Sequence, residues 1–227
     1  MLPLPKSQSQ LSPKVRILIV DDHSIVRRGL AMLIGDQPDL EVCGEAASIP
    51  EALALAKETK PQLAIIDLTL GEGNGLSLIK TLKALDPALL VLVCSMHDEE
   101  LFAERALHAG ALGYVEKGES DAAVVDAIRC LLEGRVYLSA SMNNRLVRSL
   151  VGRGQVTGES PLKNLSDREV EVLEMIGHGQ TSRQIADKLH LSVHTIESHR
   201  ENLKRKLKLE SGVELTRYAV QWVLDKS

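Results

Sequence analysis

Short apolar runs alternate with longer helical patterns five times within the first 134 residues of this 227-residue chain. The runs predict strands at Val15–Val20, Glu41–Ala46, Leu63–Asp67, Leu89–Cys94 and Leu112–Val115. The helical patterns cover Ser24–Gly35, Ile49–Thr59, Gly75–Leu85, Asp98–Ala109 and Ser120–Glu133. Because parallel strands need long crossover connections, the alternation predicts an α/β fold: a doubly wound, five-stranded parallel sheet with helices on both faces.

Apart from a linker, the pattern of the remaining residues predicts helices. Residues 151–163 are glycine-rich and lack periodicity, which predicts a linker, and residues 139–150 could form a short bridging helix before it. Beyond the linker, helices are expected at about 166–177, 181–189, 192–208 and 211–225. Their starts are marked by Ser192 and by three capping boxes, Ser166/Glu169, Thr181/Gln184 and Ser211/Glu214.

A tight turn between the second and third of these helices predicts a small all-α helix-turn-helix domain. We therefore expect three segments: a first domain over 14–134, a bridging helix and linker over 135–163, and a second domain over 164–227.

Composition narrows the class of protein. Only 2% of the residues are aromatic, so stacking on single-stranded nucleic acid is not expected. The chain shows neither a secretion signal nor an apolar run long enough to span a membrane, and its three cysteines, Cys43, Cys94 and Cys130, lack metal-binding spacing. We expect a cytoplasmic protein with no membrane partner. The net charge is -7 over residues 1–138 and +3 over 139–227, which suggests a polyanionic partner for the second domain.

Three carboxylates follow two of the predicted strands. Asp21 and Asp22 come after the first strand, and Asp67 ends the third. In a doubly wound sheet the carboxyl ends of the strands meet at one edge, where ligands bind. Clustered carboxylates repel one another and are costly to desolvate, so this edge is expected to hold a cation or to perform chemistry.

The first domain resembles the receiver domain of bacterial two-component response regulators, which has a flavodoxin-like fold. The resemblance rests on the three carboxylates together with Ser95 after the fourth strand, Tyr114 in the fifth and Lys117 after it. It spans nearly all of residues 14–134, and the whole set is highly specific although each residue alone would be weak. Taken singly, an aspartate after a strand is often only a helix cap.

The resemblance implies roles for these residues. Asp67 would be the nucleophile that becomes an aspartyl phosphate, and Mg²⁺ would be held by Asp22, Asp67 and the backbone carbonyl of Thr69, with Asp21 acting mainly through water. Lys117 would pair with the phosphoryl group and Ser95 would hydrogen-bond it. Tyr114 would then rotate inward as a switch. The chain would not be an enzyme on an external substrate, although its receiver can autocatalyse its own phosphorylation and dephosphorylation.

The turn after Asp67 departs from the family pattern. Gly71 stands where the family commonly has proline, so backbone restraint beside the nucleophile is expected to be weaker. The spacing of Gly71, Gly73 and Gly75 fails the dinucleotide-binding fingerprint, which needs its third glycine one residue later. A flexible turn into a helix is the stronger interpretation.

The second domain resembles the DNA-binding domain of the LuxR/FixJ type. The residues that carry this resemblance run from Leu165-Ser166 through Ile185-Ala186 and Thr195-Ile196 to Glu214-Leu215. The third helix has an inward stripe of Ile196, Leu203 and Leu207, with His199 expected to pack beside it.

Double-stranded DNA would be contacted by the other face of this third helix. Its expected members are His194, Thr195, Glu197, Ser198, Arg200, Glu201, Lys204, Arg205 and Lys208. Glu201 is the favoured intrahelical partner of Arg205, and Glu197 is favoured as a base contact over a partner of Arg200. A solvated charged face is the alternative. In the family the last helix supports a homodimer.

The two resemblances together imply a response regulator that controls transcription. A sensor histidine kinase would phosphorylate Asp67, and phosphorylation would favour a dimer on DNA. One alternative is a DNA-binding regulator that ignores phosphorylation and uses its first domain only to dimerise. Another is a phosphatase of the haloacid-dehalogenase type, but that class needs a second acid where Thr69 stands.

Overall fold

The computed structural model describes residues 13–71, 73–97, 99–150 and 165–224. The predicted linker at 151–163 lies outside these residues. The strands of the first domain are β1 (Val15–Val20), β2 (Leu40–Ala46), β3 (Leu63–Ile66), β6 (Leu90–Ser95) and β7 (Gly113–Glu116). Its helices are α1 (Ser24–Gly35), α2 (Ile49–Thr59), α3 (Gly75–Leu85), α4 (Glu99–Ala109) and α5 (Asp121–Leu132).

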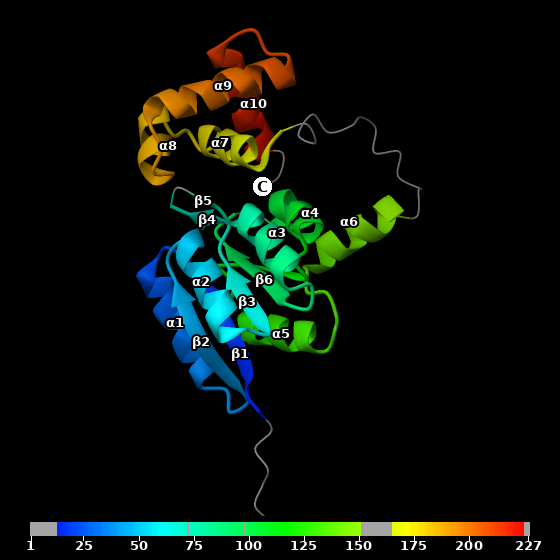
Figure 1. Cartoon of the computed structure of the whole chain (residues 1–227). Helices are drawn as coiled ribbons and strands as arrows, with labels where there is room; N and C mark the ends of the chain where they lie inside the picture. Colours follow the sequence, from blue (N-terminus) through cyan, green and yellow to red (C-terminus); the bar gives the residue numbers. More distant parts are fainter. Residues whose placement is uncertain (1–12, 72, 98, 151–164, 225–227) are drawn as a thin grey trace, which may run out of the picture.

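The five strands form one parallel sheet in the order β2-β1-β3-β6-β7 (Figure 1). The predicted α/β fold is confirmed, and the three helices α1, α2 and α3 begin and end at the predicted residues. Along β1 and β3 alternate residues enter two separate cores. Ile17 and Ile19 join a cluster with α1 and α5, whereas Leu18 and Val20 join one with α2, α3 and α4. Each face of the sheet is therefore covered by helices, as strands apolar on both faces require.

A small hairpin was not predicted. The turn expected to be flexible forms β4 (Thr69–Leu70) and β5 (Gly73–Asn74), which pair antiparallel, and Asn74 caps α3 by accepting hydrogen bonds from two backbone amides. Gly71 adopts a left-handed backbone with φ of 52°, where a side chain is strained.

The second domain contains α7 (Asp167–Gly177), α8 (Ser182–Lys188), α9 (Val193–Leu207) and α10 (Gly212–Leu224). The helix α6 (Ala140–Leu150) precedes it and packs on α4. Complete capping boxes are present at Ser166 and Thr181, and Ser192 caps α9. The box predicted at Ser211 is half formed, because the Glu214 carboxylate accepts from the amide of Glu210.

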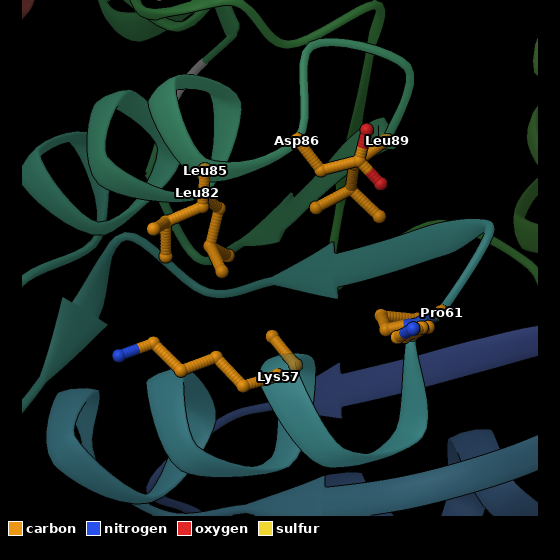
Figure 2. A pocket seen from close by; sticks show the side chains of 8 residues that line it. Lys57, Pro61, Leu82, Leu85, Asp86 and Leu89 are labelled. Atoms are coloured by element: carbon orange, nitrogen blue, oxygen red, sulfur yellow. The ribbon is translucent and has the colours of Figure 1, made fainter.

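A pocket of about 320 Å³ lies between α2 and α3. Figure 2 shows Lys57, Pro61, Leu82 and Asp86 among its lining side chains. Pro61 precedes β3, so the pocket is at the amino ends of the strands, opposite the edge that carries Asp67. It therefore takes no part in the site described below. No helix among the described residues is long and apolar enough to cross a membrane.

Candidate functional site

The acidic edge forms where β1 and β3 end. These strands are neighbours at the point where the strand order reverses, which is the place where doubly wound sheets bind ligands. Ligand atoms of Asp21, Asp22, His23 and Asp67 lie within 4.8 Å of one another. The predicted carboxylates are thus brought together, and His23 joins them although the sequence reasoning did not include it.

Lys117 reaches this cluster from the loop after β7. Its Nζ atom lies 2.6 Å from Oδ2 of Asp21 and 2.6 Å from Oδ2 of Asp67. Burial lowers the pKa of Lys117, but the Asp67 charge and the hydrogen bonds to both carboxylates outweigh it and raise that pKa. Burial also raises the pKa of Asp21, which the hydrogen bond from Lys117 partly opposes. One cation thus compensates only part of the negative charge.

The donor set suits a hard divalent cation. The Oδ1 atom of Asp67 is buried and has no hydrogen-bond partner among the described residues, so it can bind an ion or attack an electrophile. Asp22 is oriented by the Gly71 amide, which donates to its Oδ2 atom over 3.1 Å. The β4–β5 pairing and this hydrogen bond both involve the turn for which weak restraint was expected, and that expectation stays a prediction. Proline at position 71 would have neither the φ angle nor the amide hydrogen.

Gly75 allows the chain to pass close to Asp67. A Cβ atom built on Gly75 would lie 2.2 Å from the Asp67 carbonyl oxygen, and the Gly75 amide donates to the Leu68 carbonyl. Any side chain here would push the backbone that carries Asp67. The third glycine of the turn therefore has a packing role.

Ser95 and Tyr114 lie beside the acidic edge and are both buried. The Tyr114 ring is already inside, and its hydroxyl donates to the His97 carbonyl over 2.7 Å. Burial raises the pKa of Tyr114 well above its ordinary value. Tyr114 therefore already occupies the inward position, and its role as a switch stays a prediction. His97, which the sequence reasoning missed, donates its amide to Ser95 Oγ over 3.4 Å.

The helix α9 carries the predicted DNA-facing side chains. Ile196 and Leu203 are fully buried, and His199 is half-buried beside them, with its pKa lowered by burial. The outward residues His194, Glu197, Ser198, Glu201, Arg205 and Lys208 are exposed, whereas Thr195, Arg200 and Lys204 are half-buried.

The ion pairs on α9 differ partly from the prediction. Glu201 is an intrahelical partner, but of Lys204 at 2.7 Å and not of Arg205, which donates to Asn202. Arg200 approaches Glu197 only to 3.9 Å. Glu197 is therefore weakly paired, which leaves its carboxylate available.

Two family models match the chain. Residues 17–129 match the response regulator receiver domain, and residues 163–219 match the bacterial regulatory proteins of the luxR family. Over 213 residues the chain is 35% identical to the oxygen regulatory protein NreC of Staphylococcus epidermidis, covering 91% of this chain and 97% of the relative. The chain belongs to the LuxR-type response regulators. NreC of Staphylococcus carnosus is 34% identical over a similar span.

Solved structures agree with this assignment. A LuxR-family two-component response regulator from Aurantimonas is 38% identical, with a TM-score of 0.56 over 61% of this chain and 99% of that one. RcsB of Salmonella enterica serovar Typhimurium, bound to the rprA promoter with the phosphomimetic BeF3-, is 25% identical, with a TM-score of 0.60 over 91% of this chain and 98% of that one. This response regulator thus combines a receiver with a LuxR-type DNA-binding domain.

Proposed function

We propose that Asp67 accepts a phosphoryl group from a sensor histidine kinase and that this modification controls binding of double-stranded DNA. The observation that carries the proposal is the buried Oδ1 atom of Asp67, which no residue in the described part of the chain hydrogen-bonds and which lies beside an acidic pair and a lysine. One carboxylate oxygen is held by Lys117, and the other is left to attack phosphorus.

The metal that such chemistry needs is Mg²⁺, which would neutralise the attacking carboxylate and the phosphoryl oxygens. Asp22, Asp67 and the Thr69 carbonyl would supply oxygen ligands, and Asp21 would act through water. Lys117 would shift from its carboxylate partners to the phosphoryl oxygens, and Ser95 would donate a hydrogen bond to them. The bond formed joins Asp67 to phosphorus, the donor group leaves, and later attack by water restores the carboxylate.

The DNA side of the proposal uses α9. Its exposed N-terminal residues His194, Glu197 and Ser198 are placed to reach base edges, and Arg200, Lys204, Arg205 and Lys208 suit phosphate oxygens. Thr195 and Glu201 complete the face. The dimers of RcsB bound to DNA support a homodimer here, because one such domain buries too little surface for tight binding.

Each of the three segments predicted from the sequence would have its own role. The receiver over 14–134 would sense the kinase, the segment 135–163 would connect the two parts, and residues 164–227 would bind DNA. As a regulator of transcription the chain would act in the bacterial cytoplasm, and its only chemistry would be the gain and loss of its own phosphoryl group.

The test combines labelling with DNA binding. Wild-type protein incubated with a small acyl phosphate and Mg²⁺ should be labelled, and Asp67→Asn should not. Affinity for duplexes selected from a random library should rise on phosphorylation of the wild type only, at a stated salt concentration. Labelling that survives in Asp67→Asn would refute the phosphoacceptor. DNA affinity that ignores phosphorylation would favour the alternative in which the receiver only dimerises.

A further inference from the structure

The helix α7 is buried along its length. All eight residues from 169 to 176 are buried, including Glu169, Glu171 and Glu174. A helix covered all round must pack on two sides. One side packs on α9 and α10, and Figure 1 shows α7 lying between α9 and the receiver. Two of the three buried glutamates, Glu171 and Glu174, contact residues of the receiver.

His97 of the receiver lies between these two glutamates. Its Nδ1 atom is 2.9 Å from Oε2 of Glu174, and its Nε2 atom is 3.6 Å from Oε1 of Glu171. Arg168 of the same helix, 2.6 Å from Glu171, supplies a second cation. The four charges balance, which is the condition under which buried carboxylates are tolerated. A separate ion pair joins Arg105 to Asp167 at 2.6 Å.

Thr69 fixes the direction of the hydrogen bonds. Its hydroxyl donates to Glu171 over 3.3 Å, so it accepts from Nε2 of His97 over 3.0 Å. Both ring nitrogens of His97 then donate, one to Thr69 and one to Glu174. Burial lowers the pKa of His97, but the two glutamates outweigh it and raise that pKa to about 9. His97 is therefore a charged imidazolium, and both of its ring N–H groups donate hydrogen bonds.

The same histidine is tied to the acidic edge. Its amide donates to Ser95 Oγ, and its carbonyl accepts from the Tyr114 hydroxyl. Thr69, its other neighbour, is two residues from Asp67. If Ser95 turned toward a phosphoryl group on Asp67, it would release the His97 amide. Both backbone groups of His97 are thus hydrogen-bonded to residues of the proposed switch, Ser95 and Tyr114.

We propose that His97 is a positioning residue that latches α7 to the receiver in the unphosphorylated protein and releases it when Asp67 is phosphorylated. The inference rests on the proposed function and adds the link between its two domains. The latch acts through α7 and not by covering α9, since most outward residues of α9, including His194, Glu197 and Ser198, are exposed while α7 contacts the receiver. It therefore controls the orientation of the DNA-binding domain, and with it the geometry in which two copies meet paired half-sites.

The test uses Glu174→Gln, His97→Gln and the double variant. Glu174 is suited to this because its ion-pair partner across the interface is His97, whereas Glu171 also holds Arg168. Glu169→Gln is the matched control: it makes the same change on the same helix, but its partner Lys206 belongs to the same domain. The probe is the duplex that phosphorylated wild type selects from a random library.

Unphosphorylated Glu174→Gln and His97→Gln should each bind this duplex roughly tenfold more tightly than unphosphorylated wild type, and the double variant no more tightly than either. Their radius of gyration by small-angle X-ray scattering should also increase. Because the coupling between DNA binding and phosphorylation is reciprocal, the duplex should raise the extent of Asp67 labelling in wild type and in Glu169→Gln. It should raise it much less in the latch variants, Glu174→Gln and His97→Gln. If His97 only stabilised the fold, replacing it would not change this reciprocal effect.

The inference would be overturned if the latch variants matched wild type in DNA affinity and radius, or if Glu169→Gln changed both as much as they do. Labelling of Asp67 separates this from failure of the proposed function. Latch variants that are labelled normally but show no change in coupling refute only the latch. Absence of labelling in wild type refutes the phosphoacceptor itself.

Discussion

The amide of Gly71 donates a hydrogen bond of 3.1 Å to Oδ2 of Asp22, joining the turn after β3 to the acidic pair after β1. Gly71 makes this bond with a left-handed backbone, at φ of 52°, directly after β4. It orients one of the proposed metal ligands. The residue that departs from the family pattern is therefore part of the site.

Gly71→Pro should weaken Mg²⁺ binding, although it restores the residue common in the family. Proline removes the amide hydrogen and cannot adopt φ of 52°, so we expect a loss of about 3 kcal/mol in receiver stability and slower phosphorylation. Calorimetric titration with Mg²⁺ checks the affinity. Gly71→Ala keeps the amide and should cost only about 1 kcal/mol. Equal Mg²⁺ affinity in wild type and Gly71→Pro would show that the hydrogen bond to Asp22 is unimportant.

Gly75→Ala should damage the receiver strongly. The new Cβ atom would collide with the Asp67 carbonyl, which is backbone and cannot move aside without shifting the nucleophile. We expect a loss of about 3 kcal/mol in the free energy of unfolding and almost no labelling of Asp67. Urea denaturation followed by circular dichroism gives the first quantity.

The matched control is Gly29→Ala in the middle of α1, where a Cβ atom meets nothing within 4 Å. Alanine favours helix over glycine, so this change should stabilise the receiver by roughly 0.5–1 kcal/mol. A Gly75→Ala variant as stable as wild type would contradict the close approach.

Glu169 should make the stability of the DNA-binding domain depend on acid pH. Burial raises the pKa of Glu169, but the hydrogen bond from Lys206 and those at Ser166 outweigh it and lower that pKa. With the folded pKa below the unfolded value of roughly 4.3, the stabilisation is complete above that pH and is lost as pH falls through the lower folded pKa. At pH 7 Glu169→Gln should cost about 1 kcal/mol.

The measurement is the difference in unfolding free energy between wild type and Glu169→Gln over a pH series. This difference should shrink as the pH falls below about 4. A difference that stays constant down to pH 3 would mean that the carboxylate gains nothing from Lys206.

Much of the architecture follows from local patterns. The three helices from Ser24 to Leu85 were predicted to the residue because apolar periodicity, strand alternation and turn residues are properties of neighbours in the chain. The acidic edge followed as well, since parallel strands must deliver their carboxyl ends to one side of the sheet.

Other features depend on residues that are distant in the sequence. Two local details also differ from the prediction, the half-formed cap at Ser211 and the pairing of Glu201 with Lys204, because each is a choice between near-equal neighbours. The restraint at Gly71 depends on Asp22, which lies 49 residues away. Nothing in the order of residues indicated that His97 would meet Glu174, 77 residues later.

The sequence by itself determined the two domains, the order of their elements and the carboxylates that gather at the acidic edge. Short-range hydrogen bonding and the burial of apolar periodicities are enough to specify these. Only the tertiary structure decided that Gly71 holds Asp22, that Gly75 leaves room for the Asp67 backbone and that His97 is enclosed by two glutamates of α7. These contacts form only when separate elements pack together. A contact between residues that are distant in the sequence produces no periodic pattern along the chain, so the sequence does not reveal it.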